Sequence, residues 1–384
     1  MSASKTPIVG ISYEDLFYFS INFDAQIEDP ICDRVLDGIA QAFGRASEEN
    51  SSLGILAVTD VPGLCEKRMR LLPMARDLAL LEDKSDIIHI ESNYQTGWSH
   101  GNEVFADGRP DTAKGSFYAN PFLEESNMKQ ESKRVEITED TKRNHPEFFA
   151  PNVWPSTLPE FRNAMMDVSN LVIEVGRLLA RPCDAYVSRE CGSGYNPSTI
   201  TRVLEDSKFA KARLLHYFPI DRTEMSDDEN NCSDWCGWHN DHGSLTGLIP
   251  AMYLDLEGNI IECPDEQTGL YIQSRDGLIH HVSLPESSIG FQIGETSQIH
   301  TGGILQATPH AVRGSRSKGV TRESFAVFME PEFDGRMDLP KGKTVSDVQD
   351  ASLVMPSSVR TLASRWSQGM TFGEFSNATF KAFY

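Results

Sequence analysis

The spacing of apolar residues changes along the chain, from a helical period in the first half to a period of two after about residue 212. Residues 91–155 are rich in Gly, Pro, Asn and Asp, so we expect mostly loops there. Pro73 is expected to kink the helix that contains it. The predicted elements of this half are helices over 31–44, 65–81 and 156–180 and a strand within 53–63.

The second half predicts a series of short strands with turn signals every eight to twelve residues. The predicted strands lie at 212–220, 244–256, 269–274, 278–284, 287–294, 297–301, 304–312 and 322–333. Arg275-Asp276-Gly277 is typical of a hairpin turn between two of them. Such a series indicates a sandwich or a jelly roll. The tail, 345–384, is expected to be helical again.

Composition is that of an ordinary globular protein, with 384 residues, 39% hydrophobic and 24% charged. The net charge of −21 argues against nucleic acid or an anionic membrane surface as a partner, because either would repel the chain. The N-terminus has no signal-peptide core and no apolar run approaches 18 residues, so we expect a cytoplasmic protein. The seven cysteines are scattered and odd in number, which indicates reduced thiols.

Candidate metal ligands stand just before the stretch 244–256. His239 and Asp241 are two residues apart, and side chains at i and i+2 of an extended chain point the same way. His310, much further along the chain but in the same predicted sheet region, offers a third ligand. Two imidazoles and one carboxylate on one face of a metal are typical of non-haem Fe(II) oxygenases. A closed zinc site would require a fourth protein ligand.

A candidate anion site follows on the next predicted strand. Arg322 and Ser324 share one face of it, and a buried guanidinium is costly without an anion beside it. Arginine binds a carboxylate through two parallel hydrogen bonds, which lysine cannot copy. A dicarboxylate such as 2-oxoglutarate would, with Fe(II), Asp241 and Arg322, give a site with no net charge.

These motifs resemble those of the 2-oxoglutarate and Fe(II)-dependent dioxygenases, in the branch similar to isopenicillin N synthase and the plant soluble oxygenases. Flanking segments extend the likeness over nearly the whole chain: TPIVGISYEDL, GILAVTDVPG, NVWPSTLPEFR and TFGEF. The resemblance implies that His239, Asp241 and His310 bind iron. It also implies that Arg322 and Ser324 bind the distal carboxylate of 2-oxoglutarate.

One departure from the family pattern lies on the strand 212–220. The family often has Asn-x-Tyr there, and the Tyr helps to hold the co-substrate. Here His216 and Phe218 occupy those places. His216 can still donate a hydrogen bond to the co-substrate, whereas Phe218 cannot, so we expect Arg322 to bear more of the binding.

The resemblance implies a mainly β protein with helices: a double-stranded β-helix, or jelly roll, with an α/β N-terminal region and C-terminal helices. The expected boundaries are 1–155, 156–340 for the core with its long backing helix, and 341–384. The implied activity is hydroxylation or desaturation of a small organic metabolite by O2. It is coupled to oxidative decarboxylation of 2-oxoglutarate to succinate and CO2. The sequence carries no signal for an oligomeric state.

Three alternatives stay open. They are an oxidase of the same fold that does not use 2-oxoglutarate, a non-catalytic ligand-binding homologue, and a zinc-dependent cupin-like enzyme. A zinc cluster of Cys232, Cys236, His239 and His242 is disfavoured, since the Cys and His pairs lie too close in sequence for a finger-like site. The acidic stretch 223–234 is interpreted as a solvated loop.

Overall fold

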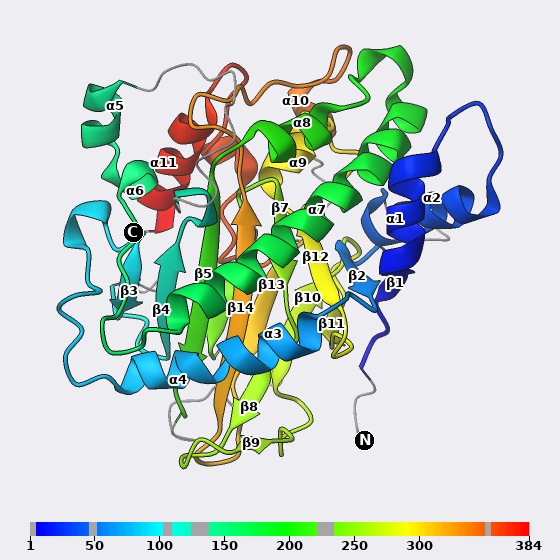
Figure 1. Ribbon diagram of the computed structural model, residues 1–384. Coiled ribbons are helices and arrows are strands. Elements are labelled where there is room, and N and C mark those ends of the chain that lie inside the picture. The colour runs from blue at the N-terminus through cyan, green and yellow to red at the C-terminus, as the bar shows by residue number, and fades with distance from the viewer. Residues whose placement is uncertain are drawn as a thin grey trace.

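A computed structural model describes residues 5–45, 52–102, 110–123, 138–220, 234–349 and 355–383. Two sheets form its centre (Figure 1). The larger contains β1 (Val9–Ser12), β2 (Ile55–Thr59), β3 (Gly97–His100), β4 (Lys114–Ala119), β5 (Ala210–Tyr217), β7 (Leu245–Leu248), β8 (Met252–Leu254), β9 (Ile260–Ile261), β12 (Ile289–Ile293) and β14 (Thr321–Met329). The smaller contains β6 (Cys236–His239), β10 (Gly269–Gln273), β11 (Ile279–Val282) and β13 (His310–Arg313).

The order of the larger sheet is β1-β2-β12-β7-β14-β5-β4-β3, with β8 paired to β14 and β9 to β8. The order of the smaller sheet is β11-β10-β13-β6. All described pairings are antiparallel except that of β1 with β2. This is the expected double-stranded β-helix, extended at one edge by β1 and β2 and at the other by β3 and β4 from the N-terminal region.

Helices cover the larger sheet and both of its ends (Figure 1). They are α1 (Tyr13–Asn22), α2 (Pro30–Phe43), α3 (Leu64–Leu71), α4 (Pro73–Leu80), α5 (Glu139–Asn144), α6 (Pro146–Phe149), α7 (Phe161–Cys191), α8 (Thr199–Asp206), α9 (Glu295–His300), α10 (Val345–Val348) and α11 (Phe372–Phe383). Short 3-10 turns lie at Ile90–Ser92, Pro121–Leu123, Gly192–Gly194 and Leu362–Ser364. No helix in these described ranges has both the length and the apolar character needed to cross a bilayer.

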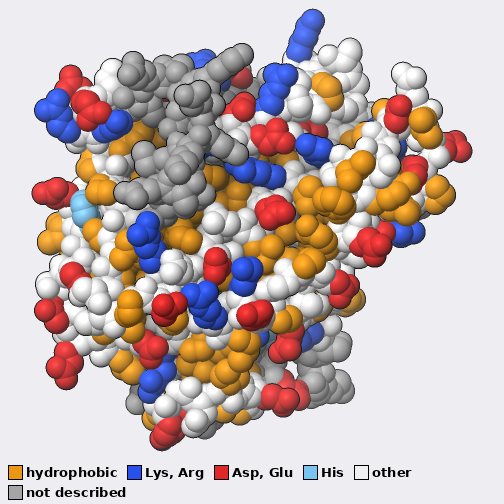
Figure 2. Space-filling view, viewed as in Figure 1, with side chains coloured by type: hydrophobic (Ala, Val, Ile, Leu, Met, Phe, Trp, Pro, Cys, Tyr) orange, Lys and Arg blue, Asp and Glu red, His pale blue; other side chains and the backbone are white. Residues whose placement is uncertain are grey.

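Helix α7 packs directly on the larger sheet, which its apolar stripe predicts. Its buried residues include Val168, Val172 and Val175, and it contacts β7 and β14. The sheet makes room for the helix with a glycine, because a Cβ at Gly247 would lie 2.3 Å from Val172 Cγ1. The face that carries α3 and α7 mixes acidic, basic and apolar side chains, so the net charge is not gathered there in one patch (Figure 2).

Several predicted elements are confirmed. The helix predicted over 31–44 is α2, and Asp29 caps it through the N–H groups of Ile31 and Cys32. The helix predicted over 65–81 is divided at Pro73 into α3 and α4. The helix predicted from 156 begins only at Phe161, because Ser156 instead bonds to Asp86, outside the helix, through its N–H and its hydroxyl.

Other predictions are wrong. The segment 91–155, expected to be mostly loops, also contains β3, β4, α5 and α6, and residues 297–300 of the strand predicted over 297–301 belong to helix α9. The long strand predicted over 244–256 is divided into β7 and β8 around Pro250, since proline has no N–H for the ladder. The expected helical tail, in contrast, is confirmed: its described residues contain α10, α11 and the 3-10 turn Leu362–Ser364. The acidic stretch 223–233 and Cys232 lie outside the described residues.

We expect Gly247→Ala to destabilise the protein by about 1–3 kcal/mol, because the added methyl group overpacks the contact between α7 and β7. Urea unfolding followed by circular dichroism measures the change. Gly10→Ala is the matched control, since a Cβ there would lie in ordinary contact, 3.5 Å from Thr59 Cγ2. Equal stability losses for the two variants would contradict the packing argument.

Candidate metal centre

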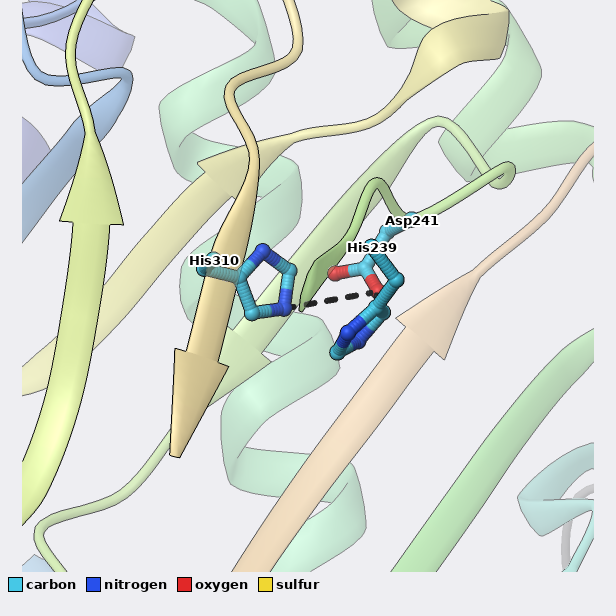
Figure 3. Close-up of side chains that lie close together, drawn as sticks. All are labelled: His239, Asp241 and His310. Atoms are coloured by element: carbon cyan, nitrogen blue, oxygen red, sulfur yellow. Dashed lines mark ion pairs between the residues drawn. The ribbon is translucent and has the colours of Figure 1, made fainter. Parts of the chain in front are cut away.

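The three predicted ligands come together between the two sheets. His239 is the last residue of β6, His310 is the first residue of β13, and the two are register partners across this antiparallel pair. Their ring centroids are 4.2 Å apart. Asp241 lies in the turn that follows β6, and its carboxylate points toward both rings (Figure 3). The sequence prediction that these side chains converge is therefore confirmed in geometry.

One carboxylate oxygen is shared between the two imidazoles. Asp241 Oδ1 is 3.8 Å from His239 Nε2 and 3.8 Å from His310 Nε2. One ligand atom from each of the three residues lies within 4.8 Å of the other two. No other group of His, Cys, Asp and Glu in the described ranges is arranged to hold a metal ion.

The Nδ1 atoms of the His239 and His310 rings lie near backbone carbonyl oxygens. His239 Nδ1 is 2.7 Å from the carbonyl oxygen of Gly237, and His310 Nδ1 is 3.5 Å from that of Thr308. An N–H at Nδ1 can donate to the carbonyl, which leaves the Nε2 lone pair for a cation. With Nδ1–H bonded in this way, both Nε2 atoms would present a free lone pair to a metal once His239 has lost its extra proton.

The electrostatics of the site also suit a cation. Although burial opposes it, the two neighbouring imidazoles lower the pKa of Asp241, so the carboxylate is ionised at neutral pH. Burial and His239 lower the pKa of His310 to about 4, so this ring is neutral. For His239, burial is outweighed by Cys236, whose Sγ is 3.9 Å from Nδ1, and by Asp241, and its pKa rises to about 9. A metal ion at Nε2 would displace that proton.

A buried polar atom without a partner tests whether a metal fits. Asp241 Oδ2 is buried and accepts no hydrogen bond from the described residues, although buried carboxylate oxygens normally find a donor. A cation held by the carboxylate and the two Nε2 atoms would supply the missing charge. Two nitrogens and one carboxylate oxygen suit Fe(II), and three protein ligands leave coordination positions open. The residues present therefore fit the metal that the sequence predicted.

The triad opens into a cavity of about 290 Å³ between the sheets. Arg322 and Ser324, from β14, line the same cavity. The Arg322 guanidinium lies 5.1 Å from the ring centroid of Tyr217, and its Nε has no hydrogen-bond partner in the described part of the chain. No carboxylate of the described residues lies within ion-pair distance of Arg322, although this side chain is only 8% exposed. A buried guanidinium is costly without an anion beside it, so the wall at Arg322 has the charge that a carboxylate ligand would need.

His216 does not reach this cavity. In the pairing of β5 with β14, His216 is the partner of Glu323, whereas Tyr217 is the partner of Arg322. His216 Nδ1 lies 2.9 Å from both carboxylate oxygens of Glu323, on the opposite face of the strand from the cavity. The structure therefore contradicts the expected contact between His216 and 2-oxoglutarate.

Tyr217, which the sequence motifs did not single out, lines the cavity beside Arg322. The alternation of side chains along β5 gives the missing signal: Arg213, Leu215 and Tyr217 all line the cavity. Counting in steps of two from Arg213, a polar residue on a buried strand, would have placed Tyr217 on the same wall.

The alternative zinc cluster is not assembled by the residues that are described. His242 points away from the triad: its Nε2 lies 3.1 Å from Ser376 Oγ, and its ring stacks on Phe372 at a centroid distance of 5.8 Å. Cys236 lines the cavity beside His239, but it is not part of the group that can hold a metal.

Comparison with known proteins identifies the fold. No protein-family model matches the sequence. A protein of Dictyostelium discoideum named as a probable iron/ascorbate oxidoreductase is 32% identical over 113 residues. The alignment covers 29% of this chain and 27% of that protein, so the chain matches little more than a quarter of the relative's length.

Solved structures match over almost the whole chain. A 2OG-Fe(II) oxygenase family protein from Caulobacter crescentus has a TM-score of 0.62 at 17% identity, covering 98% of this chain and 99% of that one. A Neurospora crassa protein, in complex with alpha-KG and thymine, has a TM-score of 0.61 at 15% identity, with 99% of each chain covered. JOX2, in complex with 2OG, Fe and JA, has a TM-score of 0.57 at 15% identity, covering 98% of this chain and 87% of that one. At such identities the likeness establishes the fold.

We expect Asp241→Ala and His310→Ala each to abolish measurable binding of Mn(II), a divalent ion that is stable in air, because only two ligands remain in each variant. Calorimetric titration measures the binding. His100→Ala is the control, since His100 is exposed and its ring Nε2 lies 3.0 Å from the Thr112 carbonyl, outside the triad. Unchanged affinity in the two triad variants would place the metal elsewhere.

The jelly roll supplies the frame, and the convergent histidine and aspartate side chains supply a donor set that suits iron. The chain thus has the fold of the 2OG-Fe(II) oxygenase structures, and its His-Asp-His triad is assembled within that fold.

Proposed function

We propose that the protein is an Fe(II)- and 2-oxoglutarate-dependent oxygenase that hydroxylates or desaturates a small organic metabolite. The observation that carries the proposal is the convergence of His239, Asp241 and His310 on one cavity that also holds Arg322. Bound there, Fe(II) would supply O2 activation coupled to the oxidative decarboxylation of 2-oxoglutarate to succinate and CO2.

The residues of the triad would hold the metal and keep half of its positions free. Three protein ligands would leave coordination positions free for the co-substrate and O2. The carbonyls of Gly237 and Thr308 would fix the orientation of the two rings. The chain's role at the metal is thus to fix geometry and to hold the protons at Nδ1.

Arg322 and Ser324 would hold the distal carboxylate of 2-oxoglutarate. They lie two apart on β14 and line the same wall of the cavity. The Tyr217 ring beneath the guanidinium restricts its orientation, so that its fork of N–H groups is prepared for a carboxylate. Since the wall is buried, the hydrogen bonds to that carboxylate would form without competition from bulk water.

The substrate class follows from the cavity and from the relatives. A cavity of about 290 Å³ accepts a small molecule rather than a folded macromolecule. Thymine and JA are the small molecules bound in the Neurospora crassa and JOX2 structures. A cytoplasmic location and the division of the chain at 155 and 340 belong to the same proposal, with the N-terminal part supplying strands to both edges of the larger sheet.

We expect Arg322→Lys to weaken 2-oxoglutarate binding about 10- to 100-fold, because a bidentate, charge-assisted pair is replaced by a single ammonium contact. Anaerobic titration of the Fe(II) protein with 2-oxoglutarate, followed by the visible charge-transfer absorbance, gives the affinity. Arg177→Lys is the control: Arg177 is half-buried and donates to the Leu204 carbonyl, away from the cavity.

The same titration separates the alternatives. A wild-type protein that binds iron but develops no charge-transfer band would point to the oxidase of the same fold, and turnover without succinate release would support it. A protein that binds both iron and 2-oxoglutarate but never consumes O2 would be a ligand-binding homologue. Zinc in protein purified without oxygen would indicate the cupin-like enzyme.

A further inference from the structure

The turn that carries Asp241 is held along its backbone by the start of helix α9. Residues 294–296 donate hydrogen bonds to the four consecutive backbone carbonyl groups of residues 241–244. The bonds are Glu295 N–H to Asp241 O at 2.8 Å, Thr296 N–H to Gly243 O at 3.1 Å, Gly294 N–H to Ser244 O at 3.1 Å and Thr296 Oγ1 to His242 O at 2.7 Å. The two segments approach so closely that a Cβ at Gly294 would lie 2.0 Å from Gly243 O.

The side chain of Glu295 ties this contact to the C-terminal part of the chain. Arg365 donates from Nη1 to Glu295 Oε2 at 2.8 Å and from Nη2 to Oε1 at 2.6 Å, and each side chain is 3% exposed. Asn240, which stands between the two ligands His239 and Asp241, donates to Glu295 Oε1 at 3.3 Å. The buried bidentate ion pair between Arg365 and Glu295 therefore contacts the turn that carries the metal ligand Asp241.

Helix α11 holds the next residue of the same turn. His242 Nε2 lies 3.1 Å from Ser376 Oγ, and the His242 ring is parallel to that of Phe372, with an interplanar angle of 5°. Arg365 also donates to Thr379 Oγ1 at 3.0 Å, so the ion pair and the helix form one support. Residues much later in the sequence thus hold Asn240, Asp241 and His242 in place.

A buried ion pair is a poor means of adding stability, because well-packed apolar side chains do as well without the desolvation cost. What an ion pair adds is direction: its two parallel hydrogen bonds define where Glu295 sits, and the N–H of Glu295 defines where Asp241 sits. The position of a metal-binding carboxylate is a property for which such direction matters.

We propose that Glu295 and Arg365 are positioning residues for the metal ligand Asp241, so that docking of the C-terminal segment and metal binding reinforce each other. This inference rests on the proposed function, because it requires that the triad holds the metal. Coupling of this kind is reciprocal: if the docked segment raises metal affinity, bound metal stabilises the docked segment by the same factor.

Mn(II) titration of Glu295→Gln and Arg365→Lys tests the proposal. Each variant keeps the approximate size of the side chain but loses the paired charged hydrogen bonds, and we expect the dissociation constant to rise about tenfold or more, as for other residues that orient metal ligands. The double variant is expected to bind no more weakly than the weaker single variant, because both substitutions remove one interaction.

Asp184→Asn is the matched control. Asp184 is also a buried carboxylate and accepts from the Ile200 and Thr201 N–H groups and the Tyr195 hydroxyl, away from the ligand turn. It is expected to lower the melting temperature while leaving the Mn(II) affinity unchanged. Wild-type affinity in the Glu295 and Arg365 variants would overturn the inference while leaving the metal site intact. Failure of the wild-type protein to bind Mn(II) would overturn both proposals.

Hydrogen exchange on the wild-type protein gives a second test that needs no variant to fold. Addition of Mn(II) is expected to slow amide exchange in α11 and at 362–366 more than in α1, which packs on α2, α7 and β1. Equal protection of α1 and α11 would mean that the metal stabilises the whole fold without a special link to the C-terminal segment, and would contradict the proposal.

Discussion

The site depends on the pairing of β6 with β13. This one antiparallel ladder sets His239 opposite His310, and no other described contact joins the two imidazoles as directly. The register shifts between His310 and Val312, so the ladder is irregular at the very residue that supplies the ligand. Irregular pairing re-aims side chains. Here it accompanies two rings at an interplanar angle of 56°, each with its Nε2 atom 3.8 Å from Asp241 Oδ1.

The larger sheet contributes through alternation rather than through irregularity. The pairing of β5 with β14 is continuous, so neighbouring residues point to opposite faces along both strands. Arg322 and Tyr217 face the cavity, whereas Glu323 and His216 face away from it. Glu323, fully buried, accepts from the Thr321 hydroxyl and lies against His216. Each face of this strand pair therefore has its own polar group, and the two are kept apart by the sheet.

Sequence reasoning predicted what depends on residue type and short spacing. His239, Asp241 and His310 could be recognised as candidate metal ligands from their residue types. Arg322 and Ser324 could be placed on one face of a strand because they are two residues apart. It failed where the facing of a side chain depends on the strand register, as for the adjacent residues His216 and Tyr217, which point to opposite faces of the sheet. It also failed where a backbone contact overrides a local pattern, as for helix α9, whose first N–H groups bond to the carbonyls beside Asp241. The ion pair between Glu295 and Arg365 could not be predicted, because no local sequence pattern around either residue indicates its partner.

The alternation along β14 has a consequence for the tolerance of this strand to insertions. Adding or deleting one residue before Arg322 would turn Glu323 inward and the guanidinium outward, and so would reverse the sign of the charge on the cavity wall. Such a register shift would change the burial of apolar side chains little, since β14 is buried almost throughout. Electrostatics, more than packing, would then decide which register of this strand a functional homologue can keep.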